Sequence, residues 1–134
     1  MVCIYCSADT QVINSRHQKR ANNVWRRRKC TGCGAVFTTT EAADLSQTIR
    51  VRRTMNGLEN FSRDALFVSV HDSLRHRPTA AADASALTAT IITRLLARQT
   101  ATIDREYIVA TATDVLEHFD MAACTHYQAY HPIA

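Results

Sequence analysis

The apolar residues in the second half of the chain recur with helical spacing. Beyond residue 62 they fall three or four positions apart, which places them on one face of a helix. Four helices are predicted: one from an N-cap at Ser62 to a point before Pro78, one along the stripe 84–96, one from an N-cap at Asp104, and a weaker one at 121–130. The core-facing positions expected on the first three are Leu66, Phe67, Val70 and Leu74; Ala84, Leu87, Ile91, Ile92, Leu95 and Leu96; Ile108, Ala112, Val115, Leu116 and Phe119.

The first 41 residues follow a different pattern. Short extended runs at 10–14, 24–28 and 35–40 lie between polar turns, and this segment has too few large apolar side chains to build a core. A further strand is predicted where Ile49 and Val51 alternate with arginines, followed by a turn at Asn56-Gly57. We therefore expect an α+β protein with a small strand-rich domain at 1–45 and a mostly helical domain with a short β-hairpin at 46–134.

The composition is that of a folded chain. Its 134 residues are 46% hydrophobic and 21% charged, and include only three glycines and two prolines. No apolar run approaches the roughly 20 residues needed to cross a bilayer, and Cys3 and Cys6 stand where a signal peptide would need apolar residues. We expect a soluble, cytoplasmic protein without a membrane partner.

Positive charge is concentrated near the N-terminus. Residues 1–53 contain ten Lys and Arg against three acidic residues, whereas residues 54–134 contain six Arg against nine acidic residues. Clustered positive charge attracts polyanions through Coulomb forces and counterion release. A nucleic-acid partner is therefore expected to bind the N-terminal part, although basic surface also serves solubility alone.

Four of the five cysteines form two CxxC pairs separated by 23 residues: Cys3, Cys6, Cys30 and Cys33. Two such pairs provide the tetrahedral four-sulfur shell of a structural zinc ion, with no open position for catalysis. An iron–sulfur centre has the same ligands, and two disulfides are the remaining alternative. Gly32 and Gly34 are expected to allow tight turns at the second pair, where the first pair has Ser7. Cys124 stands alone and is expected to pack in a core.

A run of cations lies between the two cysteine pairs. Alternation along a strand would direct Arg26 and Arg28 to one face and Arg27 and Lys29 to the other, with Arg16 on the preceding strand. Such cations bind phosphates, and arginine forks also recognise guanine edges in duplex DNA. We interpret these five residues as a surface for double-stranded DNA. The alternative is an ordinary solvated face.

The spacing of these motifs resembles a known family. They are similar to the N-terminal zinc ribbon of the bacterial ribonucleotide reductase repressor family, NrdR, in four segments: Cys3-x-x-Cys6, Asp9-Thr10-x-Val12-Ile13-Asn14-Ser15-Arg16, Arg26-Arg27-Arg28-x-Cys30-x-x-Cys33 and Phe37-Thr38-Thr39-x-Glu41. The resemblance extends over most of the chain, because residues 46–134 look like the ATP-cone that follows the ribbon in that family. The similar positions there are Val51-Arg52-Arg53, Glu59-x-Phe61, Leu66, Arg77-Pro78 and Tyr127-x-x-Tyr130.

The resemblance implies a zinc-dependent repressor that binds paired operator boxes upstream of ribonucleotide reductase genes. ATP or dATP, with Mg²⁺, would change how the homo-oligomer assembles. The nucleotide-binding residues implied are Val51, Arg52, Arg53, Glu59, Arg63 and Tyr127. The sequence departs from the family pattern at three places: Arg53 replaces a lysine, a second lysine falls near Ala65 so that Arg63 is the nearest cation, and Cys124 replaces an aromatic residue.

No enzymatic activity is expected. The sequence contains no phosphate-binding loop of the Walker type, no GxGxxG motif and no carboxylate pair at convincing spacing, and its six histidines are dispersed. Two other classes of function stay open at this point. One is an accessory or regulatory subunit of a ribonucleotide reductase, and the other is a nucleic-acid-binding ribbon protein with a degenerate ATP-cone.

Overall fold

The computed structural model describes residues 1–55 and 57–132, and it divides into two compact units, Met1–Asp44 and Leu45–Ala134. The N-terminal unit is made of strands around a four-cysteine site, and the C-terminal unit is mainly helical with a small sheet. The predicted α+β class is confirmed. Among the described residues, no helix combines the length and apolar character that a membrane crossing needs.

The N-terminal unit is a three-stranded antiparallel sheet. Its strands are β1 (Thr10–Gln18), β2 (Asn23–Cys30) and β3 (Val36–Glu41), with β2 in the centre. All three predicted strands are present, and each extends beyond or is shifted slightly from its predicted range. Cys3 and Cys30 are the buried side chains of this unit, so it has no apolar core. This unit therefore depends on the cysteine site for its stability.

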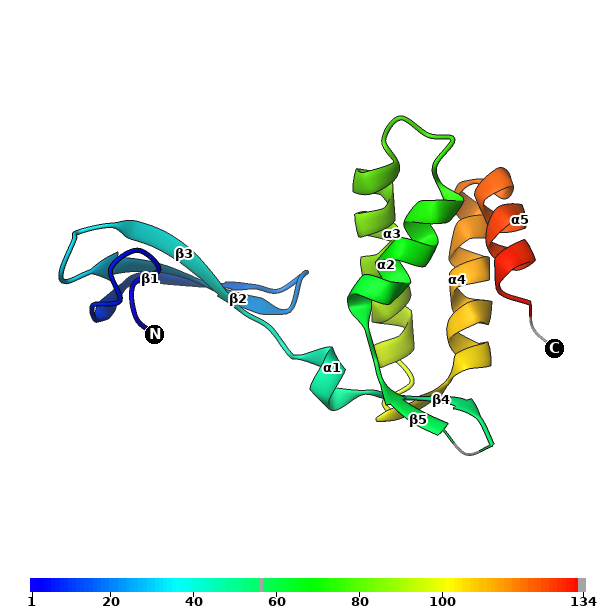
Figure 1. The fold of residues 1–134 in the computed structure, drawn as a ribbon, viewed down its shortest axis with the longest axis horizontal. Coiled ribbons are helices and arrows are strands. Elements are labelled where there is room, and N and C mark those ends of the chain that lie inside the picture. Colours follow the sequence, from blue (N-terminus) through cyan, green and yellow to red (C-terminus); the bar gives the residue numbers. More distant parts are fainter. Residues whose placement is uncertain (56, 133–134) are drawn as a thin grey trace. The chain divides into compact units, whose positions relative to one another are not determined.

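A small sheet lies at one end of the helices of the C-terminal unit (Figure 1). After the short helix α1 (Leu45–Thr48), the strands β4 (Arg50–Thr54) and β5 (Gly57–Asn60) form an antiparallel hairpin. The strand β6 (Thr102–Asp104) pairs in parallel with β4 on its other edge. The hairpin was predicted, but α1 and β6 were not. Gly57 begins β5, and the other half of the predicted turn, Asn56, lies outside the described residues.

The four predicted helices are present as α2 (Arg63–Ser73), α3 (Ala80–Leu96), α4 (Arg105–Phe119) and α5 (Met121–Tyr130). Ser62 caps α2 by accepting a hydrogen bond from the Ala65 N–H at 3.1 Å. Asp104 occupies the N-cap position of α4, but its side chain makes no capping bond. It instead pairs with Arg52 of β4 at 3.1 Å.

The helices enclose one hydrophobic core, which also receives side chains from β4 and β6. Most of the predicted core positions lie in or against it, including Leu66, Val70, Ile91 and Leu116. Two predictions were wrong, because Leu96 and Phe119 are exposed. Both stand at the last turn of their helices, where the apolar stripe leaves the packed region. Cys124 is buried in the core, as expected of a cysteine that packs.

The turn between α2 and α3 is fastened to the start of α5. Asp120 caps α5 through the Ala123 N–H at 3.1 Å and accepts hydrogen bonds from His76 at 2.9 Å and from Arg77 at 3.1 Å. The bond from His76, followed by the one from Ala123, holds the pKa of the Asp120 carboxyl well below its usual range. These contacts fix the position of α5, and with it Tyr127, whose side chain is 2% exposed.

Candidate functional site

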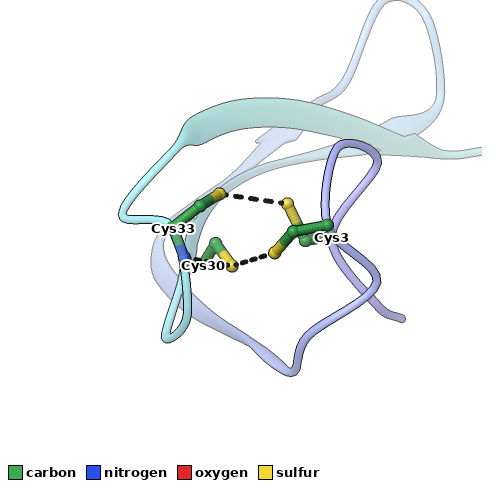
Figure 2. Close-up of side chains that lie close together, drawn as sticks. Cys3, Cys30 and Cys33 are labelled. Carbon is green, nitrogen blue, oxygen red and sulfur yellow. Dashed lines mark hydrogen bonds between the residues drawn. The ribbon is translucent and has the colours of Figure 1, made fainter.

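The four paired cysteines converge on one point of the N-terminal unit. Their sulfur atoms all lie within 4.8 Å of one another. The Sγ atoms of Cys3 and Cys33 are 3.7 Å apart, and those of Cys6 and Cys30 are 3.4 Å apart (Figure 2). Four sulfurs at about 2.3 Å from a tetrahedral zinc ion would be about 3.8 Å from one another. The cluster therefore fits zinc closely, as the spacing of the two pairs predicted.

Local backbone geometry directs the thiols inward. The Tyr5 N–H donates to the sulfur of Cys3 at 3.4 Å, and the N–H groups of Gly32 and Cys33 donate to the sulfur of Cys30 at 3.3 and 3.4 Å. These bonds close a tight turn within each pair and stabilise negative charge on the sulfurs. The sequence predicted the pairs but not these donors, which belong to the backbone.

The residue after each cysteine pair adopts a left-handed backbone. Gly34 has a φ of 73° and Ser7 a φ of 61°. Glycine adopts this conformation without the steric cost that serine has to bear, as expected from the contrast between the two positions. At Gly32 the reason for glycine is close packing, because a Cβ atom there would lie 2.8 Å from the Cβ of Ala8.

Negative charge on the four cysteine sulfurs needs a cation to compensate it. Hydrogen bonding, first from the Cys33 N–H, lowers the pKa of the Cys30 thiol to about 6. The Ala35 N–H acts in the same direction on Cys33, yet the neighbouring thiol of Cys6, with burial and the other two thiols, raises the pKa of Cys33 to about 11. Adjacent thiolates repel each other unless a cation compensates their charge. A divalent zinc ion held by the four cysteines would supply this compensation.

The strand that ends in Cys30 carries the basic residues predicted to bind DNA. Arg26 forms an ion pair with Glu41, and Arg28 donates to the hydroxyls of Thr10 at 3.3 Å and Thr39 at 3.4 Å. Both of these arginines are half-buried on one face of the sheet. They are thus held by partners within the sheet and are less available to a ligand.

The opposite face of β2 is open. Arg27 and Lys29 are exposed there, and within the described parts of the chain neither forms an ion pair. Arg16 of β1 lies directly across from Trp25 and therefore shares this face, because opposed residues of an antiparallel pair point the same way. We call Arg16, Trp25, Arg27 and Lys29 the open basic face. It combines an aromatic ring with three cations that form no ion pair among the residues the structure describes.

Net charge differs between the two units. Met1–Asp44 contains seven Lys and Arg against three acidic residues, whereas Leu45–Ala134 contains nine of each. The apparent acidity of the C-terminal part disappears once Arg50, Arg52 and Arg53 are assigned to the unit in which they fold. The excess positive charge of the chain thus belongs to the ribbon.

Four of the residues implied to bind nucleotide line one cavity of about 190 Å³ in the C-terminal unit: Val51, Arg53, Glu59 and Tyr127. Arg53 and Glu59 are paired there at 2.7 Å. Burial raises the pKa of the Tyr127 phenol to about 12, so the hydroxyl is a neutral donor at physiological pH. Arg52 and Arg63 are not among the lining residues, since Arg52 extends toward Asp104 and Arg63 is exposed at the start of α2.

Sequence reasoning missed several residues of this cavity. Arg105 lines it from the first residue of α4, and His131 lines it from the end of α5. A second cavity of about 780 Å³ lies between α2 and α5 and shares Ala65, Ser69 and His131 with the first. The smaller cavity alone is below the usual size of a ligand pocket, but the two adjoin and together fall within the usual range. No local motif identifies Arg105 as a lining residue, because the parallel pairing of β6 with β4 is what brings it to the cavity.

Comparison with known proteins agrees with the ribbon geometry. Residues 1–41 match the family model "Transcriptional repressor NrdR-like, N-terminal domain". A protein of Sinorhizobium fredii described as "Transcriptional repressor NrdR" is 33% identical over 128 residues, 95% of this chain and 81% of that protein. One of Chlamydia felis with the same description is 30% identical over 124 residues, 92% of this chain and 80% of that protein.

A third relative is matched over less of its length. The protein of Nitrosomonas eutropha, also described as "Transcriptional repressor NrdR", is 34% identical over 97 residues, which are 72% of this chain and 60% of that protein. The matches to the other two relatives span 95% and 92% of this chain, so they extend well beyond the 41 residues of the ribbon model into the C-terminal unit. With the ribbon model and these relatives in agreement, the chain belongs to the NrdR family of transcriptional repressors.

Proposed function

We propose that this protein is a cytoplasmic, zinc-dependent repressor that binds double-stranded DNA at operator boxes upstream of ribonucleotide reductase genes, and that ATP and dATP control it. The observation that carries the DNA-binding part is the open basic face beside the four-cysteine cluster. Family membership supports the repressor role, since the relatives are described as transcriptional repressors.

The ribbon supplies what a duplex-binding surface needs. Zinc at the four cysteines would fix the end of β2, so that Arg27 and Lys29 meet the phosphates without first having to be ordered. Arg16 would extend the contact across the sheet, and the indole of Trp25 would pack against the sugar-phosphate backbone. Cations that are free of internal partners contribute to binding more than paired ones, because no ion pair has to be broken.

The C-terminal unit supplies the nucleotide-binding part of the proposal. The adjoining cavities offer a tyrosine hydroxyl, guanidinium groups and apolar walls, which suit a triphosphate joined to a nucleoside. Magnesium would accompany the triphosphate through its phosphate oxygens. The described residues contain no phosphate-binding loop of the Walker type, so the nucleotide would act by binding and not by hydrolysis.

A gel-shift titration tests the proposal as a whole. Purified full-length protein is titrated onto a promoter fragment from a ribonucleotide reductase operon, with ATP and dATP varied. We expect salt-dependent binding that prefers this fragment to a scrambled duplex of equal length and differs between the two nucleotides. Equal binding to both duplexes would contradict the repressor proposal and favour a non-specific nucleic-acid-binding ribbon.

The mode of control has its own test in the assembly of the protein. A nucleotide shifts an assembly equilibrium only by binding the assembled states with different affinities. We therefore expect different oligomer distributions for nucleotide-free, ATP-loaded and dATP-loaded protein in light scattering. The same mass in all three states would contradict control through assembly, and calorimetry without heat of binding for either nucleotide would remove the nucleotide from the proposal.

A further inference from the structure

The charged side chains that line the smaller cavity differ in whether they already have an ion-pair partner. Its lining contains two arginines, Arg53 and Arg105, and one carboxylate, Glu59. Arg53 lies 2.7 Å from Glu59, so its charge is already compensated. Arg105 is half-buried, and within the described residues it has no carboxylate partner. It is therefore the uncompensated cation of the lining.

The helix α2, which borders the cavity opposite Arg105, contributes no cation to the lining. The residues of α2 and its cap that line the cavity are uncharged: Ser62, Ala65, Leu66 and Ser69. The basic residue at the start of this helix, Arg63, is exposed and lies outside the lining. An anion in this cavity would thus meet positive charge chiefly from the α4 side.

The surroundings of Arg105 also favour an anion. Arg105 is the first residue of α4, where backbone N–H groups point out of the helix. The Asp104 side chain, which stands at the N-cap position, pairs with Arg52 and leaves these N–H groups uncapped. The buried Tyr127 phenol is close enough to Arg105 for the positive charge to act on its ionisation. A guanidinium, a phenol and a helix N-terminus thus meet at one cavity.

We propose that Arg105 is the principal phosphate-binding residue of this pocket, and that it performs the role for which the sequence suggested Arg63. This inference rests on the proposed binding of adenine nucleotides and specifies how their phosphates are held. The guanidinium of Arg105 forms charge-assisted hydrogen bonds with the terminal phosphates. The hydroxyl of Tyr127, which contacts Ser69 in the structure, turns to donate a hydrogen bond to a phosphate oxygen. Arg53 stays with Glu59 and shapes the wall of the pocket.

The class of ligand follows from this arrangement. An unpaired guanidinium binds more tightly to a ligand that presents more phosphate oxygens. The affinity of the protein should therefore rise from adenosine to AMP, ADP and ATP. The nucleoside would occupy the larger cavity, whose walls between α2 and α5 include Val68 and Tyr130. That cavity also contains Asp64, Asp72 and Arg75. Arg75 is paired with Asp72 at 2.8 Å, so its positive charge is already compensated, and the carboxylate of Asp64 would disfavour placing the phosphates there.

Calorimetry on the zinc-loaded full-length protein tests the role of Arg105. Arg105→Ala is expected to weaken ATP binding about 10- to 100-fold, the range of a lost charge-assisted contact, and to leave adenosine binding unchanged. Arg63→Ala, the matched control, removes the same charge outside the lining and is expected to change ATP affinity less than twofold. Equal ATP affinities of Arg105→Ala and wild type would overturn the inference.

A second variant separates charge in the pocket from an effect on the start of α4. Ala65 is exposed on α2 and lines both cavities, so a lysine there would reach the same space. In the Arg105→Ala background, Ala65→Lys is expected to restore at least half of the lost binding free energy for ATP. A loss of helical circular dichroism in Arg105→Ala would show that Arg105 acts on structure and would overturn the inference, and so would failure of Ala65→Lys to restore binding while the spectrum stays unchanged. Wild-type protein that binds no ATP would instead overturn the nucleotide proposal itself.

Discussion

Replacing Cys30 with serine is expected to abolish tight zinc binding and to unfold the N-terminal unit, while the helical unit stays folded. The reason is that Met1–Asp44 buries no apolar side chain besides its cysteines, so the metal replaces a hydrophobic core. Zinc binding to small modules of this kind is associated with about 10–16 kcal/mol of apparent free energy at neutral pH. Metal analysis should fall from about one zinc per chain to almost none, and the strands β1 to β3 should become sensitive to protease.

The control for this variant is Cys124→Ala. It also removes a thiol, but one that lies in the core of the helical unit and outside the cluster. Its zinc content should stay at about one per chain. Retention of zinc and of protease resistance by Cys30→Ser would contradict the structural role of the metal. Loss of zinc from both variants would point to general unfolding as the cause.

The double variant Arg27→Ala/Lys29→Ala is expected to lose most of the affinity for duplex DNA. Both cations are exposed on the open basic face, and each contact with a phosphate contributes about 0.9 to the slope of log affinity against log salt concentration. The slope should therefore fall by about 0.9 for each contact removed. Fluorescence anisotropy at several salt concentrations measures both the affinity and the slope, and zinc content should stay unchanged.

The matched control for DNA binding is Arg26→Ala/Arg28→Ala. It removes the same formal charge, but from side chains that are held by Glu41, Thr10 and Thr39. We expect a smaller loss of affinity and a smaller change of slope. If this control weakened binding as much as the Arg27/Lys29 variant, the opposite face of the sheet would be the DNA surface. A slope unchanged in both variants would place the surface outside β2.

The sequence predicted the metal cluster because its ligands lie in short local motifs. Two residues between the cysteines of each pair are enough to fix their geometry, whatever the rest of the fold does. The direction of the strand arginines was also predictable from alternation. Which of the two faces is open was not, because that depends on Glu41 and the threonines, which come from other strands.

The lining of the proposed nucleotide pocket was only partly predictable. Val51, Arg53 and Glu59 lie near one another along a hairpin, and the resemblance to the family identified them. Arg105 enters the pocket only because β6 pairs with β4, a contact between segments about 50 residues apart in the chain. A three-residue strand such as β6 has no periodic pattern of its own. Arg63 was favoured by nearness in sequence, yet it is exposed at the start of α2 and does not line the cavity.

In the function proposed for this protein, a zinc-stabilised ribbon holds the DNA-binding surface. The most direct measurement is the affinity of the full-length protein for a fluorescent promoter duplex before zinc is removed by chelation, after removal, and after zinc is added back. We predict that binding is lost on removal and returns with about one zinc per chain, and that Cys30→Ser shows no such recovery. DNA affinity that stays the same after complete zinc removal would show that the DNA-binding surface does not depend on the metal, contrary to the proposed function.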